Sequence, residues 1–203
     1  MTRICKIPGI LLFILSVTAV LAKGSVLPQD IATLKSMEGQ TYYLGCNLHA
    51  DLQYNKVSSV NYQLRGALLP WGTEVRVVRV LRNNLVFEIQ GKGKRYRYEF
   101  HRKTRRSVPL AEHLGRVFLE SPDHLKQQVE GMSEIDKDGI YEGRVKPGMS
   151  REAVLIAIGY PPEFANRDDL MTDHDWTYWL SRFSKMVVSF GRDGLVSGIA
   201  GDY

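Results

Sequence analysis

The chain has 203 residues, with 27 lysines and arginines against 22 aspartates and glutamates, and a formal net charge of +5. Only one of its two cysteines, Cys46, lies beyond residue 22, so the part of the chain after that point cannot form an internal disulfide. A protein of this size must therefore be stabilised by packed cores, in one large or two small domains.

The first 22 residues have the pattern of a secretory signal peptide. Arg3 and Lys6 precede an apolar run without charges, which ends at Ala22. A basic start, a short apolar middle and a small residue at the end are typical of a cleaved signal. An uncleaved anchor is the alternative, although the run is short for a membrane span of about 20 residues. In both cases we expect an exported protein, located in the periplasm, at the periphery of the outer membrane, or secreted.

Short strands are predicted after residue 40, because apolar and polar residues alternate there with period two. The expected strands cover residues 41–48, 59–64, 75–80, 85–89 and 96–100. In the third of these the apolar parity changes between Val77 and Val78, which predicts a β-bulge. Residues 82–84 and 91–93 have the asparagines and glycines that hairpin turns require. About five short strands at this spacing favour a small barrel.

One segment of this region has a family resemblance. Residues 66–75, Gly-Ala-Leu-Leu-Pro-Trp-Gly-Thr-Glu-Val, resemble the turn and strand start found in bacterial SH3-like domains. The resemblance implies an SH3-like barrel over residues 40–104 and a ligand groove lined by Trp71, Tyr96 and Tyr98. The regular alternation favours a core position for each of these aromatic residues instead.

A basic cluster lies between residues 92 and 106. It contains eight lysines and arginines, and Glu99 is the only acidic residue among them. Such a cluster attracts anionic partners, and salt screens the attraction. In an exported protein we expect an envelope or outer-membrane protein, or anionic lipid, rather than nucleic acid; a solvated strand face is the alternative. The residues of this candidate interaction surface are Trp71, Arg95, Arg97, Arg102, Lys103, Arg105, Arg106 and Trp179.

Helical periodicity is predicted after the basic cluster. A helix over residues 105–120 has an apolar stripe of Leu110, Leu114 and Val117, and we expect it to connect two domains. A second helix begins at Ser121-Pro122-Asp123 and ends near Gly131. Residues 131–140 are polar and contain two glycines, and no helix is assigned to them. The order expected from residue 121 is therefore two helices, one at 121–131 and one after Ser150, followed by three strands.

The most distinctive stretch covers residues 145–161. Gly148 forms part of a turn, Ser150 caps a helix, and Val154 lies on the buried stripe of that helix. Gly159 ends the helix, and Pro161 prevents its continuation. Three antiparallel strands are expected to follow, and the first carries Trp176 and Tyr178 on its apolar face.

This arrangement resembles the SmpA/OmlA (BamE-type) domain of small outer-membrane assembly proteins. The residues that match the family pattern are Val145, Gly148, Met149, Ser150, Val154, Gly159, Pro161, Trp176, Tyr178, Val188, Phe190, Gly194 and Val196. The resemblance implies two helices on a three-stranded sheet over residues 121–203. It also implies a non-catalytic periplasmic module that contacts envelope proteins or lipid. The same layout is similar to that of secreted β-lactamase-inhibitor proteins.

No pattern typical of catalysis or cofactor binding occurs in the sequence. The five histidines do not fall at metal-ligand spacings, and the common nucleophile, phosphate-loop and dinucleotide motifs are missing. Cys46 and His49 could form a nucleophile pair, but residues three apart near a strand end seldom face one another. We therefore expect no enzyme, no catalytic residue, no metal and no cofactor.

The expected fold class is α+β. After the signal peptide at 1–22, we expect an SH3-like β-barrel over 40–104, a connecting helix over 105–120 and a BamE-like αα-βββ domain over 121–203. The expected function is that of a non-catalytic envelope protein, an interaction or assembly module at or near the outer membrane, and membrane-peripheral at most. The alternative is a secreted inhibitor, or a module that binds a peptide or a cell-wall fragment.

Overall fold

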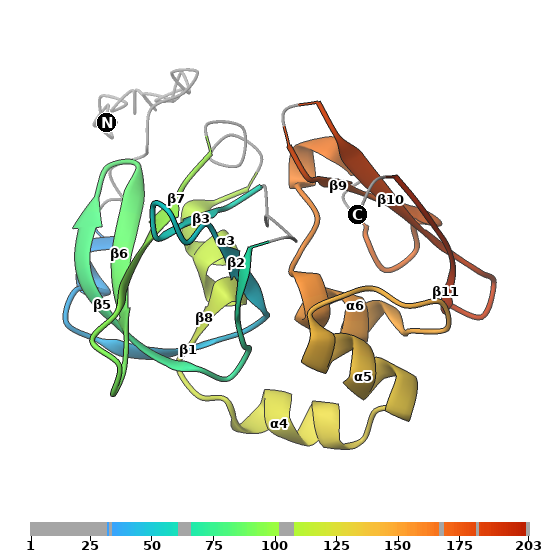
Figure 1. Ribbon diagram of the computed structural model, residues 1–203, viewed down its shortest axis with the longest axis horizontal. Helices are drawn as coiled ribbons and strands as arrows, with labels where there is room; N and C mark the ends of the chain where they lie inside the picture. Colours follow the sequence, from blue (N-terminus) through green and yellow to red (C-terminus); the bar gives the residue numbers. More distant parts are fainter. Residues whose placement is uncertain are drawn as a thin grey trace, which may run out of the picture.

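The computed structural model describes residue 32 and residues 34–60, 66–101, 108–166, 169–181 and 183–201. Within these residues the protein is a mixed α+β structure with eleven strands and five helices, one of them a short 3-10 helix. Figure 1 shows a curled sheet on one side and a smaller sheet on the other, with helices α5 and α6 beside the smaller sheet. The α+β class is confirmed, and the predicted signal peptide at 1–22 lies outside the described residues.

The curled sheet has six strands in the spatial order β3-β7-β6-β5-β1-β8. Its strands are β1 (Thr41–Leu44), β3 (Lys56–Ser58), β5 (Glu74–Leu81), β6 (Asn84–Ile89), β7 (Arg95–Glu99) and β8 (Phe118–Leu119). All neighbours are antiparallel except β3 and β7, which are parallel. A separate two-stranded ribbon consists of β2 (Leu48–Ala50) and β4 (Ala67–Leu69).

The alternation in the sequence determines which side of the curled sheet is buried. Leu85, Phe87 and Tyr98 point inward and are fully buried, whereas Arg95 and Arg97 point outward and are exposed. The strands predicted at 85–89 and 96–100 are confirmed, as are the tight turns on either side of β6.

The predicted bulge in β5 is also confirmed. The register of β5 against β6 shifts between Val77 and Arg79, so that Val78 is the extra residue. Beyond the bulge Arg79 is exposed, and Val80 packs against the core. The bulge therefore keeps the apolar side chains inward along a strand whose sequence parity changes.

The structure differs from the prediction at residues 59–64. The nearest strand, β3, ends at Ser58, and the next two residues form a bend. Asn55 has a positive φ of 47° and lies in the turn that precedes β3. Residues 61–65 lie outside the described residues.

Helix α3 (Leu110–Val117) packs on the inner side of the curled sheet. Its residues Leu110, Leu114 and Val117 belong to the same hydrophobic cluster as the strands, which we call the first core. Strand β8 follows the helix at once and pairs with β1. The segment expected to connect two domains is thus, in its described part, built into the first core.

Three helices follow where two were predicted: α4 (Asp123–Glu130), α5 (Glu134–Glu142) and α6 (Arg151–Ile158). Helix α4 begins and ends where the sequence indicated, with Ser121 Oγ accepting a hydrogen bond from the Asp123 amide at 3.2 Å. Helix α5 was not predicted. Ser133 caps it by accepting a hydrogen bond from the Asp136 amide, and the helix packs against α6.

Packing explains why glycine stands inside α5. A β-carbon on Gly139 would overlap the side chain of Met149 and lie 2.9 Å from the carbonyl oxygen of Arg144. Met149 is itself fully buried. Gly139 therefore permits close contact between α5 and the turn before α6, and this benefit outweighs the low helix propensity of glycine. The polar, glycine-containing sequence of α5 gives no sign of this contact, and the prediction of only two helices after residue 121 is wrong.

The second sheet has the order β11-β10-β9 and is antiparallel throughout. Its strands are β9 (Asp175–Trp179), β10 (Lys185–Phe190) and β11 (Val196–Ala200). Trp176 and Tyr178 are buried on the face that packs against α6, together with Val154 from that helix. This cluster, which includes residues from Ile140 to Val196, is the second core.

The predicted limits of α6 are confirmed. Ser150 Oγ accepts a hydrogen bond from the Ala153 amide at 3.2 Å. Gly148 and Gly159 have φ values of 90° and 80°, a conformation that favours glycine. Pro161 follows, and a short 3-10 helix, η1 (Glu163–Ala165), leads toward the second sheet.

A buried asparagine joins the two cores. Asn47 follows β1, is 1% exposed, and donates its backbone N–H to the carbonyl oxygen of Ile156 at 2.8 Å. Its side-chain amide donates to the carbonyl oxygens of Ile140 at 2.6 Å and Ala157 at 3.1 Å. Its side-chain oxygen accepts from the backbone N–H of Trp71 at 2.9 Å. We call the part of the chain that forms the first core the first half, and the part that forms the second core the second half. Asn47, in the first half, thus hydrogen-bonds backbone groups near the ends of α5 and α6 in the second half.

We expect Asn47→Ala to destabilise the protein by about 3 kcal/mol, because the carbonyl oxygen of Ala157 and the N–H of Trp71 lose their partner, and the carbonyl oxygen of Ile140 keeps only the N–H of Gly143, at 3.2 Å. Urea unfolding followed by circular dichroism measures the free energy of unfolding. Asn84→Ala is the matched control, since Asn84 is half-buried and its Oδ1 accepts no hydrogen bond within the described part of the chain. Equal losses in the two variants would contradict the role given to Asn47.

A second prediction compares two helix glycines. Gly139→Ala should lower the free energy of unfolding by roughly 1–3 kcal/mol, because the added methyl group overpacks the contact with Met149. Gly115→Ala in α3 should raise it by up to about 1 kcal/mol, because a β-carbon there meets no atom within 4 Å. Thermal unfolding of both variants measures the difference, and stabilisation by both substitutions would disprove the packing explanation.

Candidate interaction surface

The three aromatic residues expected to line one groove do not lie together on one surface. Tyr96 and Tyr98 are buried in the first core, as the alternation favoured. Trp71 is half-buried and packs against the second core, next to the junction made by Asn47. The open groove expected around Trp71 is therefore occupied by the second half of the same chain.

Part of the predicted basic cluster lies on β7. Arg95 forms an ion pair with Glu88 at 2.7 Å, and Arg97 forms one with Glu99 at 3.1 Å. Both arginine side chains remain well exposed, at 63% and 46%. The other four members, Arg102, Lys103, Arg105 and Arg106, lie outside the described residues.

The strand register extends this cluster into a larger basic surface. Arg79, Val86, Arg97 and Lys56 are successive partners across β5, β6, β7 and β3, so three cations share one row without an acidic residue. We call the outward side chains of these four strands the basic sheet face. Together with the turns on either side of β6 they include the cations Lys56, Arg76, Arg79, Arg82, Lys92, Lys94, Arg95 and Arg97. Three acids, Glu74, Glu88 and Glu99, oppose these eight cations and leave a net charge of +5.

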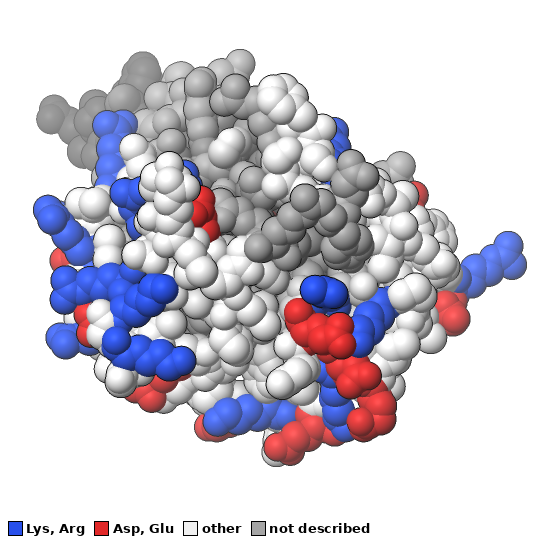
Figure 2. Space-filling model, viewed as in Figure 1, with Lys and Arg blue, Asp and Glu red and all other residues white. Residues whose placement is uncertain are grey.

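The second half of the molecule has the opposite charge. From Glu120 to the end of the described chain, thirteen aspartates and glutamates face seven lysines and arginines, a net charge of −6. Figure 2 shows a group of basic side chains on the side of the curled sheet and most acidic ones at the lower right, over α5, where basic side chains lie among them. The sequence had indicated only the basic segment after residue 92, because the cations of β3 and β5 are scattered along the chain and meet only in the folded sheet.

Trp179 lies on the second sheet, away from the basic sheet face. It is half-buried, and its ring makes an edge contact with Phe164 at 5.3 Å between centroids. The ammonium group of Lys185 lies 5.5 Å from the centre of the same ring. The turn after β9 also carries Phe183, whose side chain is 93% exposed. The structure thus separates Trp179 from the arginines with which the sequence had grouped it.

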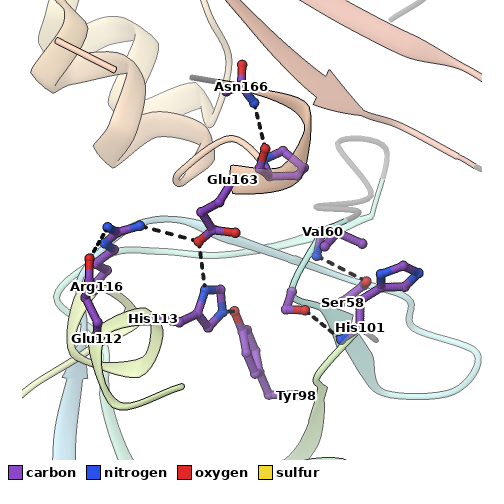
Figure 3. A network of polar contacts seen from close by, with 11 residues as sticks. Ser58, Val60, Tyr98, His101, Glu112, His113, Arg116, Glu163 and Asn166 are labelled. Carbon is purple, nitrogen blue, oxygen red and sulfur yellow. Dashed lines mark hydrogen bonds and ion pairs between the residues drawn. The ribbon is translucent and has the colours of Figure 1, made fainter. Parts of the chain in front are cut away.

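A polar network crosses the junction between the two halves. The hydroxyl of Tyr98 lies 2.8 Å from Nε2 of His113, and Nδ1 of that ring lies 3.4 Å from Oε1 of Glu163. Arg116 also reaches Glu163 Oε1 at 3.4 Å. Figure 3 shows Glu163 pointing from the 3-10 helix onto the histidine and arginine of α3. The network therefore connects η1 of the second half to the first core.

The ionisation of these groups suits a structural role. Burial would raise the pKa of Glu163, but the hydrogen bond with His113 and the charge of Arg116 outweigh it and lower the pKa. Burial raises the pKa of Tyr98 well above its ordinary value, so its hydroxyl stays protonated. Glu163 then remains an anion that pairs with Arg116. This arrangement holds two parts of the chain together, and its residues are buried or paired rather than open to a substrate.

Cys46 and His49, which the sequence suggested as a conceivable nucleophile pair, are both buried. Burial raises the pKa of the Cys46 thiol to about 12 and thereby suppresses the reactive thiolate. Burial also lowers the pKa of His49 to about 4, although a hydrogen bond with the backbone of Gly143 opposes the shift. Both groups are therefore neutral near pH 7. Within the described part of the chain, no three histidine, cysteine, aspartate or glutamate side chains are grouped to hold a metal ion.

A hollow of about 600 Å³ lies on the first half, beside the ribbon strand β4. Leu69, Ile89 and Tyr96 contribute to its apolar floor, and Lys92 and Lys94 stand at its rim. The sequence predicts a hairpin turn at residues 91–93. The sequence did not suggest that the same turn faces an apolar hollow, because residues 69, 89 and 96 are far apart in the chain.

Helices long and apolar enough to span a membrane do not occur among the described residues. Comparisons with protein-family models, with curated proteins and with solved structures find no match for this chain. The surfaces described above are consequently interpreted from their own chemistry.

The buried neutral His49 predicts a pH dependence of stability. Its pKa is about 4 in the folded protein and about 6.5 when unfolded, so the unfolded state binds more protons in between. Stability should therefore be highest above pH 6.5 and fall as the pH decreases. Between pH 7 and pH 5 we expect a loss of about 2 kcal/mol from this group.

Urea unfolding at pH 7 and pH 5 measures this loss. In His49→Gln the contribution should disappear, whatever the stability of the variant at pH 7. His124→Gln is the control, because His124 is exposed on α4 and should leave the pH dependence unchanged. A pH dependence that survives in His49→Gln would contradict the assignment.

Proposed function

We propose that this protein is a non-catalytic, exported envelope protein that acts as an interaction or assembly module at or near the outer membrane. The signal-peptide pattern of residues 1–22 supports export. The neutral, buried state of Cys46 and His49 and the paired state of Glu163 are consistent with the absence of a catalytic role. The molecule would then act through its surface.

The finer fold assignment is part of this proposal. For the second half, we propose the αα-βββ layout of the SmpA/OmlA domain. Helix α6 between Ser150 and Gly159, and a following sheet with Trp176 and Tyr178 buried, support it. For the first half, we propose a divergent SH3-like barrel, supported by the curl of the sheet and by the turn at Pro70–Gly72. The additional helix α5 and the 3-10 helix would be features of this chain.

The basic sheet face is the observation that carries the functional proposal. Its eight cations surround three acids, and neither Arg76 nor Arg79 has an ion-pair partner among the described residues. Unpaired surface cations gain little within their own protein and are available to an anionic partner. The acidic second half faces elsewhere, so the charge distribution would also orient the molecule during an encounter. The partner we propose is an acidic envelope or outer-membrane protein.

The alternative, a secreted inhibitor or ligand-binding module, is favoured by a different observation. The lysine-rimmed hollow beside β4 has the size of a small ligand site and an apolar floor. A module of this kind would bind a soluble partner and would not depend on the basic sheet face.

A crosslinked pull-down from outer membranes tests the proposal. The wild-type protein should recover outer-membrane proteins at 50 mM salt and at least tenfold less of them at 300 mM salt, because ions screen exposed charges. The triple variant Arg79→Glu, Arg95→Glu, Arg97→Glu should lose recovery to a similar extent at low salt. The triple variant Lys126→Glu, Arg144→Glu, Arg192→Glu is the matched control, since it changes the net charge equally on the acidic half.

The outcomes separate the two functions. Loss of recovery confined to the sheet-face variant supports an envelope module. Equal loss in both variants would show that net charge alone governs binding. Recovery of soluble proteins that is insensitive to both variants would favour the secreted ligand-binding module.

A further inference from the structure

An unpaired strand edge borders the hollow on the first half. Strand β4 pairs only with β2, so its other edge has no strand partner within the described residues. All three consecutive residues of β4 line the hollow, although successive side chains point to opposite faces of a strand. The hollow therefore runs along the backbone edge of β4 rather than against one of its faces.

The direction of the backbone groups on this edge follows from the pairing on the far side of β2. Asp51 exchanges two hydrogen bonds with Lys56, at 2.8 Å and 3.2 Å, so its backbone groups point away from β4. Backbone groups two residues apart point the same way, so those of His49 also point away from β4. Leu68, the partner of His49, then directs its N–H and C=O to the open edge. One donor and one acceptor are thus presented to the hollow.

The side chains around the edge define what could lie there. Leu69, Ile89 and Tyr96 are buried at its floor and offer an apolar surface. Lys92 and Lys94 are exposed and form no ion pair with any described residue. Lys94 lies 5.2 Å from the centre of the Tyr96 ring, at the boundary between floor and rim.

The net charge around the hollow is positive. Glu74 is the only carboxylate among its lining residues, against the two lysines. An anionic group near Lys92 and Lys94 would therefore meet an attractive potential, whereas a cationic group would be repelled there.

We propose that this hollow binds an extended, acidic peptide segment of a partner protein, which adds to β4 as a third strand of the ribbon. Its backbone would pair with the N–H and C=O of Leu68, an apolar side chain would lie on Tyr96 and Ile89, and an aspartate or glutamate would reach the two lysines. This inference deepens the proposed function, because it rests on the protein being an interaction module and specifies the segment that it recognises.

The length of the edge limits the segment. Natural sheets protect their edges by keeping them short or by ending them with proline, and β4 has three residues followed by Pro70. Pro70 has no N–H, so pairing cannot extend in that direction. Recognition along this short strand thus rests on few backbone hydrogen bonds, which suits a weak and reversible complex.

Peptide titrations followed by ¹H–¹⁵N NMR test the proposal with the purified wild-type protein. The probes are capped hexapeptides of alternating valine and threonine in which aspartate replaces threonine at one or two positions. A matched set carries lysine at the same positions. We expect saturable shifts at the Leu68 amide with acidic members, hydrogen exchange of that amide slowed at least tenfold, and at least tenfold weaker binding of the lysine set.

Backbone methylation of the probe tests strand addition without altering the protein. Methylating the peptide nitrogen that faces β4 should weaken binding at least tenfold, and methylating the next nitrogen, which points away, should change it less than twofold. Lys92→Glu, Lys94→Glu should weaken binding of the acidic probes at least tenfold. The control Lys126→Glu, Arg192→Glu, which makes the same charge change on the other half, should not.

Three outcomes would overturn the inference. These are no binding by any acidic probe at 2 mM, equal effects of methylation at neighbouring nitrogens, and shifts that avoid Leu68 and the residues of the hollow. The pull-down with the sheet-face variant is independent of these results. If the peptide tests fail but the wild-type protein still recovers outer-membrane proteins in the pull-down, only the peptide site is excluded. If the peptide tests and the pull-down both fail, the interaction function is excluded as well.

Discussion

The arrangement of the two halves depends on the buried amide of Asn47. Helices α5 and α6 end at the junction, where backbone carbonyl groups lack partners within their own helices. Asn47 supplies donors to both helix ends and accepts the amide of Trp71, so one side chain satisfies groups from three segments. Leaving such groups unpaired in a dry interface would be costly, which makes this contact specific in geometry as well as stabilising. The network of Tyr98, His113, Glu163 and Arg116 adds a second polar connection.

The fixed junction gives the molecule two surfaces of opposite charge. The curled sheet turns its cations outward because the inward positions of the same strands are apolar, and its bulge keeps Arg79 on the outer face. The second half carries its acids mainly on helices α4 and α5 and on the loops around the small sheet. The hollow beside β4 lies on the basic half, so the proposed peptide site and the basic sheet face would serve one anionic partner.

Local rules predicted elements whose stability comes from nearby residues. Ser150 and Gly159 mark the ends of α6 because capping involves groups within one helical turn. The bulge in β5 was visible because a change of parity concerns adjacent residues. Helix α5 escaped prediction because the value of Gly139 lies in a contact with Met149, ten residues later. The packing surface of Trp71 is likewise formed by residues from the other half of the chain, which no local pattern indicates.

The sequence by itself determined the α+β class and the secondary structure of the regular strands and of α6. It also determined that the part of the chain beyond residue 22 has no internal disulfide and that residues 92–106 are basic. These properties follow from composition and from periodicity over a few residues. The tertiary structure decided that Trp71 closes a junction instead of lining a groove, and that Cys46 and His49 are neutral. It also decided that cations from β3, β5 and β7 form one face and that β4 keeps an open edge. The physical reason is that burial, charge density and free backbone groups depend on which distant segments pack together.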